Sequence, residues 1–140
     1  MRISTKGRYG LAAMTILAQK NGYHTAEYVS NQLGVSKIYM EQVFAMLKKA
    51  GLISSQKGSS GGYILSDKHE NITIYQILKA TESSLFEPTQ SNIAGENFKN
   101  IESILVQKVW QPIDSTLEKL LSSITLEDLA TNATDDMFFI

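Results

Sequence analysis

Two short helical segments joined by only Gly34 and Val35 constrain the fold of this chain more than any other feature. Thr25 can cap a helix over residues 26–33, and Ser36 can cap a second helix with apolar residues at helical spacing. Two short helices connected by a tight turn that contains glycine are typical of a helix-turn-helix motif. Many helical hairpins share this outline, so the flanking segments decide the interpretation.

A glycine-rich hairpin follows the second helix directly. Residues 52–57 and 63–65 are β-prone, and residues 58–62 (GSSGG) between them must turn. One more helix is expected before the motif, over residues 5–20. This order of elements is that of a winged helix-turn-helix domain. We therefore predict a mainly α fold in which residues 1–82 form such a domain, with a two-stranded β wing.

The rest of the chain predicts a helical second part. Residues 83–95 are rich in Ser, Pro, Asn and Gly and indicate a connector, whereas residues 96–140 hold a long helix and a C-terminal tail. The long helix carries an apolar stripe that a monomer would leave exposed, which predicts a dimerisation helix. The predicted dimer contacts are Phe98, Ile101, Leu105, Val109, Ile113 and Leu117.

Proline and an apolar tail add two expectations for this second part. Pro112 lies inside the long helix and should break or kink it near Gln111. Thr125 can open one more short helix. The chain ends on Met137-Phe138-Phe139-Ile140, four apolar residues that need burial.

Composition excludes several classes of protein. The hydrophobic fraction of 43% and the charged fraction of 19% are ordinary for a globular fold. The absence of cysteine removes disulfides, cysteine-ligated zinc or iron–sulfur sites, and thiol catalysis. No apolar run approaches the roughly 18 residues of a membrane span, and residues 1–10 begin no signal peptide. We expect a soluble cytoplasmic protein with no metal, no cofactor and no membrane contact.

Charge is distributed unevenly along the chain. Residues 1–68 hold nine Lys and Arg against three acidic residues, and residues 69–140 hold four against eleven. A basic N-terminal half is typical of a surface that meets a polyanion. The predicted DNA contacts lie at the N-terminus, at the start of the second motif helix and in the hairpin: Arg2, Ser4, Thr5, Lys6, Arg8, Tyr9, Ser36, Lys37, Ile38, Tyr39, Glu41, Lys57, Gly58, Ser59, Ser60 and Gly61.

Two of these residues allow a second interpretation. Glu41 repels phosphate, so it either accepts a hydrogen bond from a cytosine amino group or pairs with Lys37 on its own helix. Tyr9 either contacts DNA or belongs to the core. His24 and His69 lack any catalytic or cysteine partner in the sequence, so we predict no catalytic residues and no enzyme.

Three linked motifs resemble the Rrf-type winged-helix transcription regulators, a family that includes iron–sulfur-cluster, nitric-oxide-sensing and cysteine-metabolism regulators. They are residues 39–43 (YMEQV), 47–52 (LKKAGL) and 57–63 (KGSSGGY), and residues 3–11 (ISTKGRYGL) match as well. The ending, ITLEDLA at 124–130 and MFFI at 137–140, is most similar to that of the cysteine-metabolism repressors of the family.

The resemblance implies targets and partners, and the chain departs from it in two places. Cluster-binding members carry three cysteines in the connector, which has none here, so no cluster is carried over. Lys57 replaces the usual wing arginine, which keeps a phosphate contact but loses the bidentate fork. Similarity to the cysteine-metabolism repressors implies sulfur and cysteine genes as targets and a cysteine synthase-type enzyme as a partner.

We therefore predict a sequence-specific DNA-binding transcriptional regulator, a homodimeric repressor that binds double-stranded DNA. The alternative is a protein-interaction module that acts through a partner enzyme and does not read DNA directly. Salt-dependent DNA binding distinguishes the two.

Overall fold

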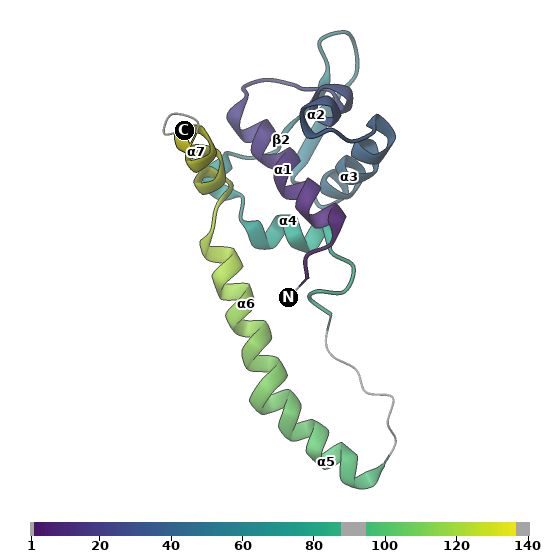
Figure 1. The fold of residues 1–140 in the computed structure, drawn as a ribbon, viewed down its shortest axis with the longest axis vertical. Coiled ribbons are helices and arrows are strands. Elements are labelled where there is room, and N and C mark those ends of the chain that lie inside the picture. Colours follow the sequence, from purple (N-terminus) through teal and green to yellow (C-terminus); the bar gives the residue numbers. More distant parts are fainter. Residues whose placement is uncertain (1, 88–94, 137–140) are drawn as a thin grey trace.

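The computed structural model describes residues 2–87 and 95–136. A head is built from the N-terminal helices, a hairpin and the last helix, and a long helical rod extends from it (Figure 1). The apolar tail for which we expected burial, Met137 to Ile140, lies outside the described residues. In chain order the elements are α1 (Thr5–Gln19), α2 (Ala26–Leu33), α3 (Lys37–Lys49), β1 (Ile53–Gln56), β2 (Gly62–Leu65), η1 (His69–Asn71), α4 (Ile74–Thr81), α5 (Glu96–Leu105), the π-helical segment η2 (Val106–Trp110), α6 (Gln111–Ser123) and α7 (Leu126–Asp136). None of the helices within these ranges is both long and apolar enough to cross a membrane.

Hydroxyl side chains cap the N-termini of four helices in the head. Ser4, Thr25, Ser36 and Thr73 are N-cap residues, and each accepts a hydrogen bond from the backbone N–H three residues further on. Gly34 ends α2 with a φ of 70°, a left-handed conformation that turns the chain at once into α3. The predicted helix-turn-helix is confirmed, and α2 and α3 begin at the caps that the sequence indicates.

The start of β2 anchors the wing to the link between α1 and α2. β1 and β2 pair antiparallel, from Ile53 opposite Leu65 to Gln56 opposite Gly62. The backbone groups of Tyr63 and His24 exchange two hydrogen bonds, of 2.7 and 3.0 Å. Gly62 has a φ of 139°, and a Cβ atom there would lie 2.6 Å from the His24 carbonyl oxygen. A glycine is therefore required where the wing meets the link between α1 and α2.

The hydrophobic core joins the first and last helices of the chain. Its largest fully buried side chains are Met14, Met40, Phe44, Leu47, Ile77 and Leu126, from α1, α3, α4 and α7. Each such side chain contributes roughly 1.5–3 kcal/mol when buried. Backbone hydrogen bonds from Ile74 to Ile124 (3.0 Å) and from Leu126 to Ile72 (2.8 Å) hold α7 against the head. The chain therefore returns to the head after the rod.

A π-helical segment accommodates Pro112 within the rod. The Gln111 N–H donates to the Val106 carbonyl, five residues back, and Pro112 occupies the first turn of α6. Proline has no N–H to donate to the helix, and the wider π turn just before it changes the hydrogen-bonding pattern at this point. The break or kink predicted near Gln111 is not found, because α5, η2 and α6 continue as one rod in which the π-helical segment accommodates the proline (Figure 1).

Candidate nucleic-acid interface

Polar and apolar groups are exposed together at the start of α3. Ser36 caps the helix, and Lys37, Ile38 and Glu41 point to solvent in the first two turns. Ile38 keeps 70% of its surface exposed, which is unfavourable unless a partner covers it. Apolar side chains at this position of a DNA-reading helix can contact thymine methyl groups in the major groove.

Gln42 is a candidate that the sequence interpretation missed. It is exposed on α3, four residues after Ile38, and therefore lies on the same face of the helix. A glutamine side chain can form two hydrogen bonds to the edge of adenine. The spacing from Ile38 is the signal that could have identified it.

The start of α1 presents a second group of exposed positive charges. Arg2, Thr5, Lys6 and Arg8 are exposed, and a shallow groove of about 620 Å³ is lined by Arg2, Ile3, Ser4, Thr5 and Arg8. The dipole at the N-terminal end of a helix favours anions, as do the surrounding positive side chains. The arrangement suits a phosphate group of the DNA backbone.

Two tyrosines connect the starts of α1 and α3. The rings of Tyr9 and Tyr39 meet edge to face, with centroids 5.7 Å apart. Burial, followed by the neighbouring Tyr9, raises the pKa of Tyr39, whereas Arg8 lowers it. The Tyr39 hydroxyl is buried and has no hydrogen-bond partner in the described part of the chain. Both tyrosines are half-buried, so their rings pack between the two helix starts.

The wing presents a polar, glycine-containing tip. Lys57, Gly58, Ser59 and Ser60 are exposed, whereas Gly61 is half-buried and its N–H donates to the Gly58 carbonyl over 3.1 Å. The tip points away from the rod (Figure 1). The Lys48 ammonium donates to Ser55 Oγ over 2.6 Å and so connects the end of α3 to β1.

Two aromatic contacts bring the three groups of predicted DNA contacts together around α3. The Tyr9–Tyr39 contact places the first group beside the start of α3, while the Phe44 and Tyr63 rings, 4.4 Å apart, place the wing beside the middle of α3. The exposed members of the predicted set are Arg2, Ser4, Thr5, Lys6, Arg8, Ser36, Lys37, Ile38, Glu41, Lys57, Gly58, Ser59 and Ser60.

The rod exposes an apolar face. Ile101 and Ile113 expose 53% and 54% of their surface, and Ile104 and Leu120 are as exposed. Phe98, Leu105, Val109 and Leu117 are half-buried, and Leu117 also packs against the core of its own chain. An apolar groove of about 490 Å³ is lined by Lys108, Val109, Pro112, Ile113, Thr116, Leu117 and Leu120.

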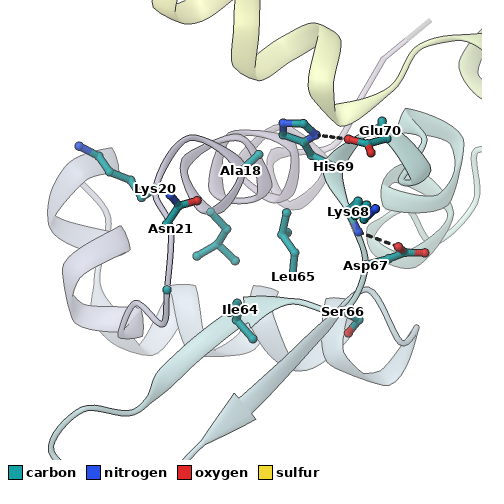
Figure 2. Close-up of a pocket in the computed structure, with 12 residues that line it drawn as sticks. Ala18, Lys20, Asn21, Ile64, Leu65, Ser66, Asp67, Lys68, His69 and Glu70 are labelled. Atoms are coloured by element: carbon teal, nitrogen blue, oxygen red, sulfur yellow. Dashed lines mark hydrogen bonds and ion pairs between the residues drawn. The ribbon is translucent and has the colours of Figure 1, made fainter.

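One cluster of side chains in the described ranges could hold a metal ion. His69, Glu70 and Glu127 each offer a ligand atom, and these atoms lie within 4.8 Å of one another. His69 Nδ1 is 3.1 Å from Glu70 Oε2, beside a groove of about 520 Å³ between the end of α1, β2 and η1 (Figure 2). We expected no metal site from the sequence, in which Glu127 is remote from the other two. Glu70 and Glu127 are exposed, and His69 is half-buried.

The fold and the exposed basic groups around α3 define a winged helix-turn-helix DNA-binding protein. Residues 3–132 match the Rrf2 family, described as an iron-dependent transcriptional regulator. The chain is 35% identical to the HTH-type transcriptional regulator CymR of Bacillus subtilis over 94% of this chain and 91% of that one. It is 32% identical to IscR of Photorhabdus laumondii, over 94% and 80% of the two chains. The structure of CymR, described as the global cysteine regulator of B. subtilis, superposes with a TM-score of 0.74 at 34% identity, covering 94% of this chain and 98% of that one.

The chain therefore belongs to the Rrf2 family of transcriptional regulators and is a regulator, not an enzyme. The iron in the family's description does not fit the donor set of this connector. The chain has no cysteine, and residues 83–97 contain no histidine. Iron–sulfur clusters are held mainly by thiolates, so this segment has no ligands of that kind to offer.

Proposed function

We propose that the protein is a homodimeric repressor that binds two-fold-symmetric operators in front of sulfur and cysteine-metabolism genes. The observation that carries this proposal is the exposure of basic and polar side chains at the start of α1, at the start of α3 and along the wing. A winged helix-turn-helix inserts α3 into the major groove and uses the flanking elements to hold the backbone.

The side chains divide into two roles. Arg2, Lys6, Arg8, Lys37 and Lys57 neutralise phosphates, which supplies most of the affinity for any duplex. Ser36, Ile38, Glu41 and Gln42 face base edges and supply the sequence preference. Ser4, Thr5, Tyr9 and Tyr39 shape the surface between the helix starts, and the wing tip over residues 58–61 approaches the DNA closely because glycine has no side chain.

Net charge orients the molecule on DNA. Residues 1–68 carry six positive charges in excess, whereas residues 69–140 carry seven negative charges in excess. The field of such a molecule attracts the basic half to DNA and repels the acidic half, which includes the rod. The change of charge at residue 68 precedes the proposed domain division at residues 82 and 96.

A second copy of the chain is the partner that suits the rod. Isologous pairing would cover Ile101, Ile113 and the groove that Ile113 lines. Two heads would then face two half-sites, which is why we expect a two-fold-symmetric operator.

The regulated genes follow from similarity. CymR of B. subtilis is described as a global cysteine regulator, and the likeness to this chain is nearly full length. We extend to this chain the control of sulfur and cysteine genes and the cysteine synthase-type partner that the family resemblance implies. The chain has no thiol and cannot sense by thiol oxidation, so the partner enzyme would report the level of the sulfur metabolite.

Titration of the protein into a labelled random duplex and into promoter DNA of sulfur genes, at several salt concentrations, tests the proposal. A dimer that neutralises roughly six phosphates gives a slope of log affinity against log salt of about −5. Addition of purified cysteine synthase should change the affinity for the promoter. Absence of salt-dependent DNA binding contradicts the proposal and favours a protein-interaction module. A DNA affinity that cysteine synthase does not change contradicts the proposed partner.

A further inference from the structure

Glu82 follows the last residue of α4 and reaches back to the start of α1. Its Oε1 atom accepts hydrogen bonds from the backbone N–H and from the hydroxyl of Ser4, both over 2.9 Å. Ser4 Oγ in turn accepts the Gly7 N–H over 3.1 Å. One carboxylate oxygen therefore fixes both the backbone and the side chain of the N-cap residue of α1.

Two glycines of α1 make room for this contact. A Cβ atom at Gly7 would overlap Glu82 Oε1, and one at Gly10 would lie 2.9 Å from Thr81 Cγ2. Glycine inside a helix is less favourable than alanine, so its presence twice on one face indicates a packing reason. The end of α4 thus lies directly on the backbone of α1.

We propose that Glu82 is a positioning residue for DNA binding, which holds residues 2–8 where their basic groups meet the phosphates. The inference rests on the proposed DNA-binding function. Arg2, Thr5, Lys6 and Arg8 are exposed around the N-cap that Glu82 fixes. An N-terminal segment without this anchor would have to be ordered on binding, at a cost in affinity.

The negative charge of Glu82 makes it possible to distinguish a positioning role from a simple electrostatic effect on DNA binding. A carboxylate among DNA-facing cations lowers the attraction for phosphate, so its removal strengthens DNA binding if charge alone matters. Its removal weakens DNA binding if the carboxylate positions the cations. The two accounts therefore predict effects of opposite sign.

Glu82 also connects the N-terminal segment to the place where the chain leaves α4. Phe86, four residues further on, packs edge to face on Tyr75 of α4, with ring centroids 5.1 Å apart. A displacement at this end of α4 would move the N-cap of α1 as well.

Glu82→Ala in the full-length protein, which removes the oxygen that accepts both hydrogen bonds, tests the proposal through DNA affinity at several salt concentrations. We expect binding about tenfold or more weaker at about 0.1 M salt, with a shallower salt slope, because phosphate contacts are lost. Gly7→Ala displaces the carboxylate without a change in charge and should weaken binding similarly. The matched control is Glu87→Ala, an exposed position whose loss of charge should leave binding unchanged or slightly tighter.

Amide hydrogen exchange of the free variants supplies a second readout that needs no DNA. Glu82→Ala should speed exchange over residues 3–7 and leave α3 unchanged. Binding by Glu82→Ala as tight as that of the wild type, or exchange over residues 3–7 that does not change, overturns the inference. A wild type that binds no DNA overturns the proposed function instead, while exchange still tests the contact.

Discussion

The Lys37 ammonium lies 3.9 Å from the Glu41 carboxylate, one turn apart on the exposed face of α3. Both side chains are about half exposed, and such a pair contributes roughly 0.3–0.5 kcal/mol to stability. So weak an ion pair leaves either side chain free to turn toward a base. The pair found in the free protein and a base contact in the complex are therefore compatible.

Substitution of Glu41 by alanine distinguishes these roles. If Glu41 selects a base, Glu41→Ala loses preference at one position in each half-site, at about 1–3 kcal/mol per contact. Random DNA should be bound as well as before or better, because a repulsive charge is removed. Binding-site selection with both proteins measures this, and an unchanged preference at every position leaves only the pair with Lys37.

Replacement of a wing cation should affect all DNA sequences alike. Lys57→Ala occurs twice in a dimer, so the slope of log affinity against log salt should become shallower by up to about two units. Lys119→Ala, an exposed lysine on the rod, is the matched control and should leave the slope unchanged. Equal slopes for Lys57→Ala and the wild type would show that Lys57 of the wing does not contact the DNA backbone.

A negative charge on the apolar face of the rod should dissociate the dimer. Ile101→Asp places an unpaired carboxylate in the proposed interface, which costs several kcal/mol. Ser103→Asp adds the same charge to an exposed position of the same helix and should remain dimeric. Sedimentation velocity measures both, and a wild type that is monomeric at micromolar concentration contradicts the interface.

Gly62 tests the anchoring of the wing. Gly62→Ala introduces strain at a φ of 139° and a Cβ atom 2.6 Å from the His24 carbonyl oxygen, and should lower the free energy of unfolding by about 2 kcal/mol or more. Gly58→Ala, at a φ of 110° in open space, carries only the strain and should cost roughly 1 kcal/mol. Urea unfolding measures the difference, and equal losses would show that the contact with His24 is unimportant.

Metal analysis of the purified protein tests the mismatch between the connector and the iron of the family's description. We expect no cluster of iron and acid-labile sulfide, because the chain has no thiolate. Stoichiometric amounts of both would show that other side chains hold a cluster.

Local chemistry made the head predictable from the sequence. Thr25, Ser36 and Gly34 act through hydrogen bonds and dihedral angles of their immediate neighbours, so a short window of sequence contains the information. The break or kink predicted at Pro112 was wrong, because the choice between a kink and a π-helical segment depends on packing along the whole rod.

Contacts between distant residues were not predictable in this way. Ser4 and Glu82 are 78 positions apart, and only the packing of α1 on α4 brings them together. Leu117 belongs to the apolar stripe of the rod, and periodicity alone does not divide such a stripe between the core of one chain and a second copy. The half-burial of Tyr39 likewise follows from Tyr9 on another helix.

Selection of bound DNA from a random pool by the purified wild type tests the central claim most directly. The account predicts enrichment of one two-fold-symmetric motif with half-sites about one helical turn apart, bound by two chains and matched upstream of sulfur and cysteine genes. A pool that shows no enriched motif after selection, or a motif without two-fold symmetry, would contradict it.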